Sequence, residues 1–349
     1  MTATRSRGRR ERRAPTIFDV AAAAGVSKST VSNVVRGVEV SEATRARVLS
    51  AIERLNYKPN AIARQFVKQR TTMLGVLVGD LSNPYYAQMA QVAERAAFHR
   101  GYTTMFCNIE GEENIAVAGV EALLEHRVAG VVFLAFIERS SPLEDALRRA
   151  AVPIVFLGLS EQWGDSVGPE DTQGGRLATE HLLSLGHERI AFVRTPLVER
   201  SGDRARYAGY RAAMRKAGRT ATGALTWEPG ADSVRAGRTR LDLATALTQP
   251  DGPTALFVSN DIGAIAMIET CETLGFGVPS DISIVGFDDI ALAGLHRISL
   301  TTVAQSLDFQ AERAVALLLE RIENPRIAPR HESVPVELKV RDSTAPPPR

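Results

Sequence analysis

Residues 16–36, TIFDVAAAAGVSKSTVSNVVR, contain two short helical patterns separated by a break at Gly25-Val26-Ser27. In the first pattern, apolar side chains recur at helical spacing, and Thr16 with Asp19 forms a predicted capping pair. Ser27 is a suitable N-cap for the second helix, and Gly37 is placed to end it. The stretch therefore predicts a helix, a tight turn and a second helix.

The second helix separates into two faces when its residues are placed about 100° apart. One face carries Thr30, Val31, Val34 and Val35, and the other carries Lys28, Ser29, Ser32, Asn33 and Arg36. A buried ridge opposite a cationic, amide-bearing face is what a helix needs to read base edges in the major groove of DNA. An ordinary amphipathic surface helix has the same two faces. The neighbouring elements and the charge of the chain must therefore distinguish a DNA-reading helix from a surface helix.

The charge of the chain is unevenly distributed. Residues 1–70 carry 15 Lys and Arg against 5 Asp and Glu, whereas the remainder carries 27 against 35. A basic N-terminal part on an acidic body predicts a polyanionic partner for the N-terminal part alone. Nucleic acid is favoured over a membrane, because no stretch approaches the apolar length that spans one.

The beginning of the chain and its cysteines predict a cytoplasmic protein. Residues 1–14 lack the apolar core of a secretory signal and are predicted to form a disordered basic tail, with an arm that contacts phosphates as the alternative. Cys107 and Cys271 have no partner motif. This predicts two cytosolic thiols and no metal site.

Further helical patterns complete the N-terminal part. Ser41 precedes a predicted third helix over residues 42–55, so residues 15–58 form a compact helix-turn-helix headpiece. Residues 59–70 follow as a linker in which Pro59 can start a helix. A helix this short is marginal by itself in water, so we expect it to form only with a partner.

From residue 72 on, short apolar runs alternate with longer amphipathic stretches. The predicted strands are residues 73–78, 102–107, 130–134, 153–157, 189–193, 254–258 and 282–287, and the predicted helices between them include 86–99, 114–126, 175–185, 206–217 and 262–274. This alternation predicts parallel sheets with helices on both faces. About 270 residues are too many for one compact sheet, which favours two doubly wound lobes. Ligands of such sheets bind at the carboxyl ends of the strands.

The sequence lacks the motifs of the common enzyme chemistries. It has no GxxxxGK[ST] loop, no GxGxxG after a strand, no GxSxG elbow and no HExxH pair. Asp261 and Asp288-Asp289 follow predicted strands, where a catalytic acid or a binding carboxylate would both fit. We predict no enzyme activity, no cofactor and no metal. Two rival classes stay open: a cytosolic α/β enzyme with an incidental basic N-terminus, and a solute-binding protein without regulation.

Eight stretches of the sequence together carry a resemblance to one family: TIFDVAAAAGVSKSTVSNVVRG, VSEATRARVLSAIERLNYKPNAIAR, LGVLVGDLSNPYYA, DTQGGRLATEHLLSLGHERIAFV, ARYAGYRAAM, FVSNDIGAIAM, VGFDDI and LTTVAQ. Over nearly its full length, the chain resembles the lac-repressor (LacI/GalR) family of bacterial transcription regulators. This resemblance implies an all-α headpiece and an α/β core of two lobes, of the periplasmic-binding-protein type. The expected effector-binding and dimerisation domain is 71–342, with lobes of 71–160 plus 292–322 and 161–291 plus 323–342. Residues 343–349, which are proline-rich, are expected to be a disordered tail.

The resemblance also assigns DNA-contacting positions. Lys28, Ser29 and Asn33 match the base-contacting positions of the recognition helix, where Lys28 could donate to guanine and Asn33 could pair with adenine. Phosphate or packing positions are Thr16, Ser27, Thr30, Ser32 and Tyr57. Residues 60–67 resemble the hinge helix that enters the minor groove, with Asn60, Ala63 and Phe66 as its contacts. The family usually has a leucine wedge where this chain has Phe66; packing between linker and core is the alternative for this ring.

For the effector, the resemblance implies a cleft between the two lobes. The matching positions are Asp80, Tyr85, Tyr86, Arg206, Asn260, Asp261, Asp288 and Gln305. A guanidinium with carboxylates suits vicinal hydroxyls, which favours a sugar. Leu157-Gly158 and Asp232-Ser233 depart from the sugar-binding pattern, so a nucleoside or another small polar metabolite remains an alternative. The predicted function is a homodimeric repressor that binds a pseudo-palindromic operator at the bacterial nucleoid and responds to this effector.

Overall fold

The structure of the chain, a computed structural model, describes residues 15–35, 38–57, 71–109, 112–135, 141–158, 163–194, 202–221, 225–226 and 244–348. Its contacts divide into two units, Met1–Thr71 and Thr72–Arg349. The predicted tail over residues 1–14 and the predicted hinge over residues 59–70 lie outside the described residues.

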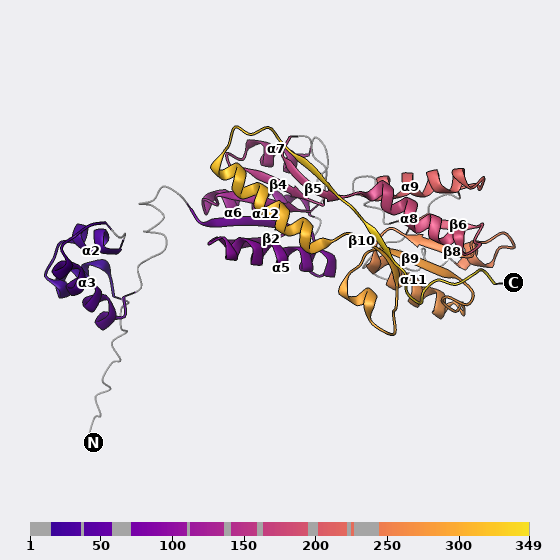
Figure 1. Ribbon diagram of the computed structural model, residues 1–349, viewed down its shortest axis with the longest axis horizontal. Helices are drawn as coiled ribbons and strands as arrows, with labels where there is room; N and C mark the ends of the chain where they lie inside the picture. Colours follow the sequence, from indigo (N-terminus) through magenta and orange to yellow (C-terminus); the bar gives the residue numbers. More distant parts are fainter. Residues whose placement is uncertain are drawn as a thin grey trace, which may run out of the picture. The chain divides into compact units, whose positions relative to one another are not determined.

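The described part of the smaller unit is a bundle of α1 (Ile17–Ala24), α2 (Lys28–Val35) and α3 (Glu42–Leu55) (Figure 1). Thr16 and Asp19 form a complete capping box at the start of α1, and Gly25 ends that helix in the left-handed backbone region. Apolar side chains of all three helices meet in one core, which contains Val20, Val31, Val34, Val48 and Ala51. The predicted helix–turn–helix is confirmed; Arg36 and Gly37 lie outside the described residues.

The first lobe of the larger unit is built on a parallel sheet with the strand order β11-β5-β4-β3-β1-β2. Its strands are β1 (Met73–Val78), β2 (Thr103–Asn108), β3 (Gly130–Leu134), β4 (Ile154–Leu157), β5 (Asp165–Pro169) and β11 (His331–Val334). One face is covered by α5 (Pro84–His99) and α12 (Leu307–Glu323), and the other by α6 (Glu113–Glu125) and α7 (Pro142–Arg149). Figure 1 shows yellow α12 beside the much earlier α5.

The second lobe has a sheet with the order β12-β10-β9-β8-β6-β7, parallel except for β12. Its strands are β6 (Ile190–Arg194), β7 (Leu225–Thr226), β8 (Ala255–Val258), β9 (Ser283–Asp288), β10 (Thr301–Ala304) and β12 (Glu337–Lys339). One face is covered by α8 (Asp171–Ser184) and α9 (Asp203–Lys216), and the other by α11 (Asp261–Thr273). The short 3-10 helix η2 (Ala291–Gly294) follows β9.

The segments of the two lobes differ from the predicted division in three places. β5, expected in the second lobe, pairs with β4 of the first sheet. β10, expected in the first lobe, pairs with β9 of the second sheet, and β11, expected in the second, pairs with β5 of the first. β5 and β10 pair with the strands that directly precede them in the chain, whereas β11 pairs with a much earlier strand. Each predicted crossing between the lobes therefore falls one strand too early. The local pattern around each strand carries no information about which sheet it enters.

The predicted disorder of residues 343–349 is wrong for residues 343–348, which pack against the second lobe. Ser343 is buried, and its Oγ donates to the carbonyl of Ile284 at 2.6 Å. The backbone N–H of Ala345 donates to Ser283 Oγ at 3.0 Å. Polar groups of Ser343 and Ala345, just before the prolines, therefore find hydrogen-bond partners in the second lobe.

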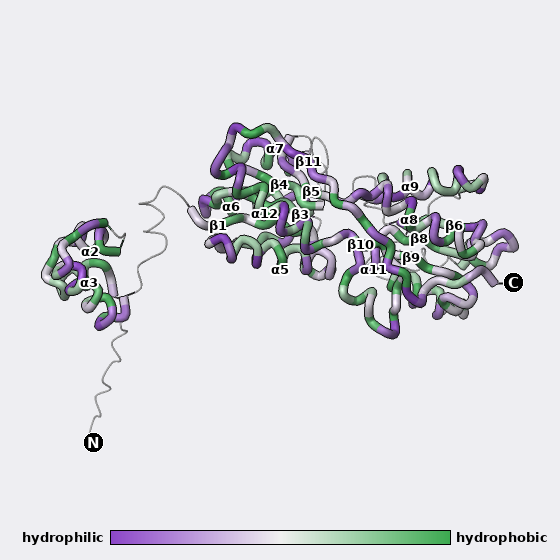
Figure 2. Tube along the Cα trace, in the orientation of Figure 1, coloured by the Kyte–Doolittle hydropathy of each residue, from purple (hydrophilic) through white to green (hydrophobic). Residues whose placement is uncertain are grey.

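The predicted fold class is confirmed: a helix-turn-helix headpiece is followed by two doubly wound lobes. The predicted strand at residues 73–78 matches β1, whereas the helix predicted from residue 206 begins three residues earlier, at Asp203. Figure 2 shows hydrophobic residues, in green, along central strands such as β4, all of whose residues are buried. Among the described residues, no helix has the length and apolar character of a membrane span.

Candidate functional site

The first candidate site is the polar face of α2. Ser27 caps the helix, because its Oγ accepts from the backbone N–H of Thr30 at 3.1 Å and lies 2.7 Å from Ser29 Oγ. Ser27, Lys28 and Ser29 are exposed, whereas Thr30, Ser32 and Asn33 are half-buried. Val31 and Val34, on the opposite face, anchor the helix in the core. The first turn of α2 is thus fixed by local bonds and offers its polar side chains to solvent.

The remaining predicted DNA contacts divide into two groups. Thr16 is half-buried and its Oγ1 donates to the Asp19 carboxylate at 2.7 Å, so this side chain holds the start of α1. Tyr57 packs against the headpiece core, which supports the packing alternative for that ring. Asn60, Ala63 and Phe66 lie outside the described residues.

The second candidate site lies at the carboxyl ends of the strands of the second sheet. Ser259 follows β8, Asp288 ends β9 and Gln305 follows β10. Arg206 reaches this edge from the first turn of α9. The edge is where a doubly wound sheet binds its ligands.

Two glycines let α9 approach α8 closely enough to place Arg206. A Cβ at Gly175 of α8 would lie 2.0 Å from the carbonyl oxygen of Arg206, and a Cβ at Gly209 of α9 would lie 2.1 Å from that of Thr172. No larger residue fits at either position without moving a backbone. The glycines of DTQGGRLATEHL and ARYAGYRAAM therefore have a positional role in the site.

The guanidinium of Arg206 is buried among carboxylates. Its Nε donates to Asp171 Oδ1 at 2.8 Å and its Nη1 donates to the carbonyl of Ser259 at 2.5 Å. The same Nη1 lies 3.8 Å from a carboxylate oxygen of Asp203 and 3.8 Å from one of Asp288. The guanidinium carbon also lies 3.7 Å from the centroid of the Phe287 ring. Burial lowers the pKa of Arg206, but the carboxylates outweigh it and hold the pKa above its usual value.

Burial makes two carboxyls of this edge, those of Asp288 and Asp261, weaker acids than usual. Burial raises the pKa of Asp288 well above its usual value, although Arg206 lowers it in part. Burial also raises the pKa of Asp261 to about 7, against the hydrogen bond from Thr302. Asp261 accepts from Thr302 Oγ1 and from the backbone N–H of Ile290 at 2.9 Å. Asp261 therefore ties the loop after β9 to β10, and its oxygens have partners within the protein.

The turn that carries Asp288 has an unusual backbone. Asp288 and Asp289 have φ values of 125° and 57°, in the region that favours glycine. Gln305 Nε2 donates to Asp288 Oδ1, and Arg341 Nη2 donates to Asp289 Oδ1 at 2.6 Å. Strained backbone held by several side chains is typical of binding sites.

The remaining predicted effector residues take different positions. Tyr85 and Tyr86 begin α5 and form an edge-to-face pair, with Tyr85 in contact with the cores of both lobes. Burial, together with the charge of Asp288, raises the pKa of Tyr86 to about 12. Asn260 caps α11 through Gly263, and Asp80 accepts from the backbone N–H of Ser82. Arg206, Asp288 and Gln305 are thus brought together, while Asn260 and Asp80 have local structural bonds.

Sequence reasoning missed Asp171, Asp203 and Ser259. Asp171 and Asp203 are the first residues of α8 and α9, and Asp203 lies three residues before Arg206 on the same helix. Two sequence features point to these contacts: the acid at the start of each helix, and the three-residue spacing of Asp203 and Arg206, which places both on one helix face. Ser259 Oγ is buried and has no hydrogen-bond partner among the described residues, as is also true of Gln305 Oε1.

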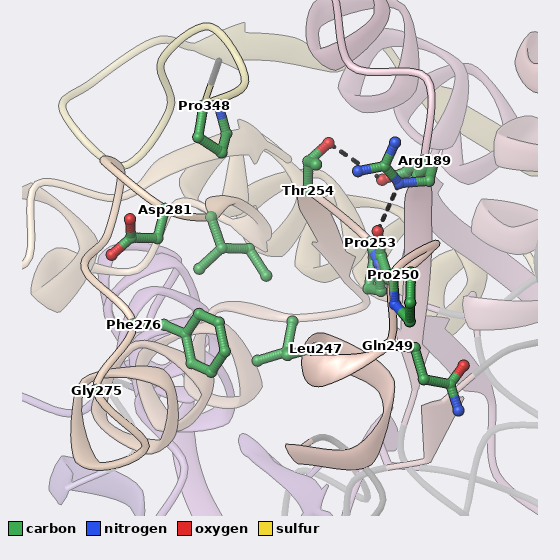
Figure 3. Close-up of a pocket in the computed structure, with 12 residues that line it drawn as sticks. Arg189, Leu247, Gln249, Pro250, Pro253, Thr254, Gly275, Phe276, Asp281 and Pro348 are labelled. Carbon is green, nitrogen blue, oxygen red and sulfur yellow. Dashed lines mark hydrogen bonds between the residues drawn. The ribbon is translucent and has the colours of Figure 1, made fainter.

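A different pocket, of about 400 Å³, lies at the opposite ends of these strands (Figure 3). Arg189, Thr254 and Ile282, which precede β6, β8 and β9, line it together with Leu247 and Phe276. Arg189 Nε donates to the carbonyl oxygen of Gly252 at 2.7 Å, and Figure 3 shows the Arg189 side chain beside Thr254 and Pro253. Because this pocket lies at the amino ends of the strands, it is separate from the Arg206 cluster at their carboxyl ends. That cluster consists of Arg206 and its partners Asp171, Asp203, Ser259 and Asp288. Among the described residues, no His, Cys, Asp and Glu group could hold a metal ion.

Comparisons with known proteins match both units of the chain to protein families. Residues 16–60 match the family of bacterial regulatory proteins named lacI, and residues 179–344 match a periplasmic binding protein-like domain. The ribose operon repressor of Escherichia coli K12 is 37% identical over 89% of this chain and 94% of its own length. The transcriptional repressor PurR of Photobacterium profundum is 34% identical over 94% of this chain and 98% of its own length.

Solved structures that are similar to this chain also include members of this family. The lac repressor dimer bound to operator and the anti-inducer ONPF is 28% identical, with a TM-score of 0.81 over 95% of this chain and all of that one. A regulator of this family from Enterococcus faecium, with bound ribose, is 27% identical, with a TM-score of 0.67 over 78% of this chain and 99% of that one. These relatives are regulators rather than enzymes. The chain belongs to the lacI family of bacterial regulatory proteins and is a DNA-binding transcription regulator.

Proposed function

We propose that this regulator is a repressor that binds a pseudo-palindromic operator as a homodimer, with one α2 helix in the major groove of each half-site. The observation that carries the proposal is the exposed polar face of α2 opposite its buried valines. Lys28, Ser29 and Asn33 would contact base edges, while Ser27, Thr30 and Ser32 would hold the helix against phosphates. Two-fold symmetry of the protein would then require two-fold symmetry in the DNA.

Residues 59–70 would connect DNA binding to the larger unit. Asn60, Ala63 and Phe66 are proposed to enter the minor groove when two linkers meet, since a segment this short needs a partner to become helical. A change at the effector site that alters the separation of the two linkers would then favour or disfavour the ordered hinge. The protein would act at the nucleoid in the cytoplasm, where its operator lies.

The DNA proposal is tested by footprinting and mobility shift on the promoter region of the regulator's own gene. We expect protection with dyad symmetry. Lys28→Ala should relax discrimination at one base pair of each half-site by about 1–3 kcal/mol. The matched control is Arg45→Ala in α3, which changes the same charge away from α2 and should not alter base preference. Protection without dyad symmetry would overturn the proposal.

We also propose that the effector is an uncharged, polyhydroxylated molecule of the size of a pentose, held at the Arg206 cluster. Among the described residues, three carboxyl groups lie within 4 Å of the guanidinium of Arg206, and burial raises the pKa of one of them, Asp288. Carboxylates accept hydrogen bonds from hydroxyls and repel phosphate or carboxylate groups on a ligand. Asp80, Tyr85, Tyr86, Asn260, Asp261 and Gln305 are proposed to complete or support this site. Similarity to a ribose operon repressor and to a ribose-bound regulator supports the same class.

The effector proposal is tested by thermal unfolding of the full chain with D-ribose, D-ribose 5-phosphate and inosine. A ligand present at about 100 times its dissociation constant stabilises the native state by roughly 2.7 kcal/mol. We expect D-ribose to raise the melting temperature and D-ribose 5-phosphate to leave it unchanged. Stabilisation by inosine alone would favour the nucleoside alternative. Stronger stabilisation by the phosphate ester would overturn the charge argument.

A further inference from the structure

The ring of Phe18 is an exposed aromatic side chain in the headpiece. Phe18 is the second residue of α1 and 64% of it is exposed, whereas its neighbours Ile17 and Val20 belong to the headpiece core. Removing a phenylalanine ring from water stabilises a folded protein, and the mostly exposed ring of Phe18 gains little of this stabilisation. Packing of the headpiece therefore does not account for a phenylalanine at this position.

The ring lies under the first residue of α2. Lys28 Nζ is 5.1 Å from the centroid of the Phe18 ring, within the range of a cation–π contact. The tight turn at Gly25, where the backbone N–H of Val26 donates to the carbonyl of Ala21 at 3.1 Å, connects α1 to α2 in this orientation. Lys28 is thus held by a residue of α1, across the turn.

A lysine side chain has a flexible stem of four carbons and loses much rotamer entropy when it is fixed in one conformation. A cation that is already held on an aromatic face loses less of that entropy when it contacts a base. Such a contact depends on direction, so it affects a base-specific interaction more than a phosphate contact that many lysine conformations can make.

We propose that Phe18 is a positioning residue for sequence discrimination: its ring holds the Lys28 ammonium in the direction that reads one base pair of each half-site. The proposal rests on the base contact of Lys28 proposed above. It predicts that the contribution of Phe18 appears in base preference and is lost when Lys28 is absent.

The test uses the full-length protein with the variants Phe18→Ala, Phe18→Tyr, Lys28→Ala and the double variant Phe18→Ala/Lys28→Ala. Affinity is measured by mobility shift at one salt concentration, for the operator and for each single-base-pair substitution of one half-site. Leu49→Ala is the matched control, because Leu49 is also an exposed apolar headpiece residue and lies on α3. Urea unfolding of each variant checks the fold, which an exposed side chain should not alter.

We expect Phe18→Ala to reduce discrimination about two- to fivefold at the base pair that Lys28→Ala also relaxes, the range of an exposed cation–π contact. Phe18→Tyr keeps a ring and should retain the discrimination, and Leu49→Ala should change nothing. In the double variant, Phe18→Ala should add no further loss at that base pair.

Two results overturn the inference and differ in meaning. If Lys28→Ala relaxes a base pair but Phe18→Ala leaves discrimination there unchanged, or weakens all sequences equally, Phe18 has no positioning role. If Lys28→Ala relaxes no base pair, the proposed base contact itself fails, and the positioning role fails with it.

Discussion

The polar face of α2 and the Arg206 cluster are both candidate binding sites, but they are built in opposite ways. The face of α2 is made by residues that are neighbours in sequence, held by a local cap and exposed to solvent. The Arg206 cluster joins residues from α8, α9 and the ends of two strands, and its side chains are buried. Substitution in the first site should therefore alter binding alone, whereas substitution in the second should also alter stability.

The largest expected effect is that of Arg206→Ala. This change leaves the carboxylates of Asp171, Asp203 and Asp288 buried without their cation, a situation that typically costs about 3–5 kcal/mol. Urea unfolding of the full-length protein measures the loss. Arg215→Ala, an exposed position on the same helix, is the control and should stay within about 0.5 kcal/mol of the parent. If Arg206→Ala and Arg215→Ala were equally stable, the Arg206 cluster would not contribute to stability, and the proposed difference from the α2 face would be wrong.

The next effect is that of Gly175→Ala, which tests the approach of α8 to α9. The new Cβ would meet the backbone carbonyl of Arg206, so the helices must separate, at a cost of about 1–3 kcal/mol and with loss of effector binding. Gly119→Ala in α6 is the control, because its nearest neighbour is the side chain of Cys107 at 3.2 Å. Unfolding and ligand-induced thermal shifts measure both variants. Unchanged effector binding in Gly175→Ala would show that the close approach does not place Arg206.

A smaller effect is expected at His187, which lies under the C-terminal segment and bonds to Thr254, Ser283 and Ala345. Burial lowers the pKa of His187, so the unfolded chain binds a proton more readily than the native protein. The stability that neutral His187 contributes is therefore present above the ordinary pKa of about 6.5. It is lost as pH falls through the lowered native pKa, with a slope of at most about 1.4 kcal/mol per pH unit.

The measurement compares urea unfolding of the parent and His187→Gln between pH 8 and pH 5. The parent should be the more stable at pH 8, and the difference should shrink as pH falls. His126→Gln, at an exposed position, should follow the parent at every pH. A difference between parent and His187→Gln that does not change with pH would contradict the prediction.

The smallest expected effect on stability is that of Lys28→Ala. Lys28 is exposed, and its contact with the Phe18 ring is also at the surface, so unfolding should change by less than about 0.5 kcal/mol. Mobility shift should nevertheless detect the loss of base preference in the same preparation. A large loss of stability would mean that the α2 face has a structural role like that of the Arg206 cluster.

Features that depend on neighbouring residues are predicted well from the sequence, and features that depend on the tertiary fold are not. The headpiece helices, the strand at β1 and the class of the fold are predicted well, because amphipathic spacing and capping residues act over a few positions. The assignment of β5, β10 and β11 to their sheets is not predicted, because the local pattern does not mark where the chain crosses between the lobes. The packing of residues 343–348 is not predicted, because their partners are far away in the chain. In the proposed effector site, Arg206, Asp288 and Gln305 are assigned by resemblance, whereas Asp171, Asp203 and Ser259 are not predicted.

Periodicity within single elements is enough to predict the helix–turn–helix, the polar face of α2 and the alternation that produces two parallel sheets. The membership of each sheet, the carboxyls around Arg206 and the contact of the Phe18 ring with Lys28 become visible only in the folded chain. Burial, charge pairing and close helix contact arise between segments that the chain brings together when it folds, so no pattern within one element encodes them.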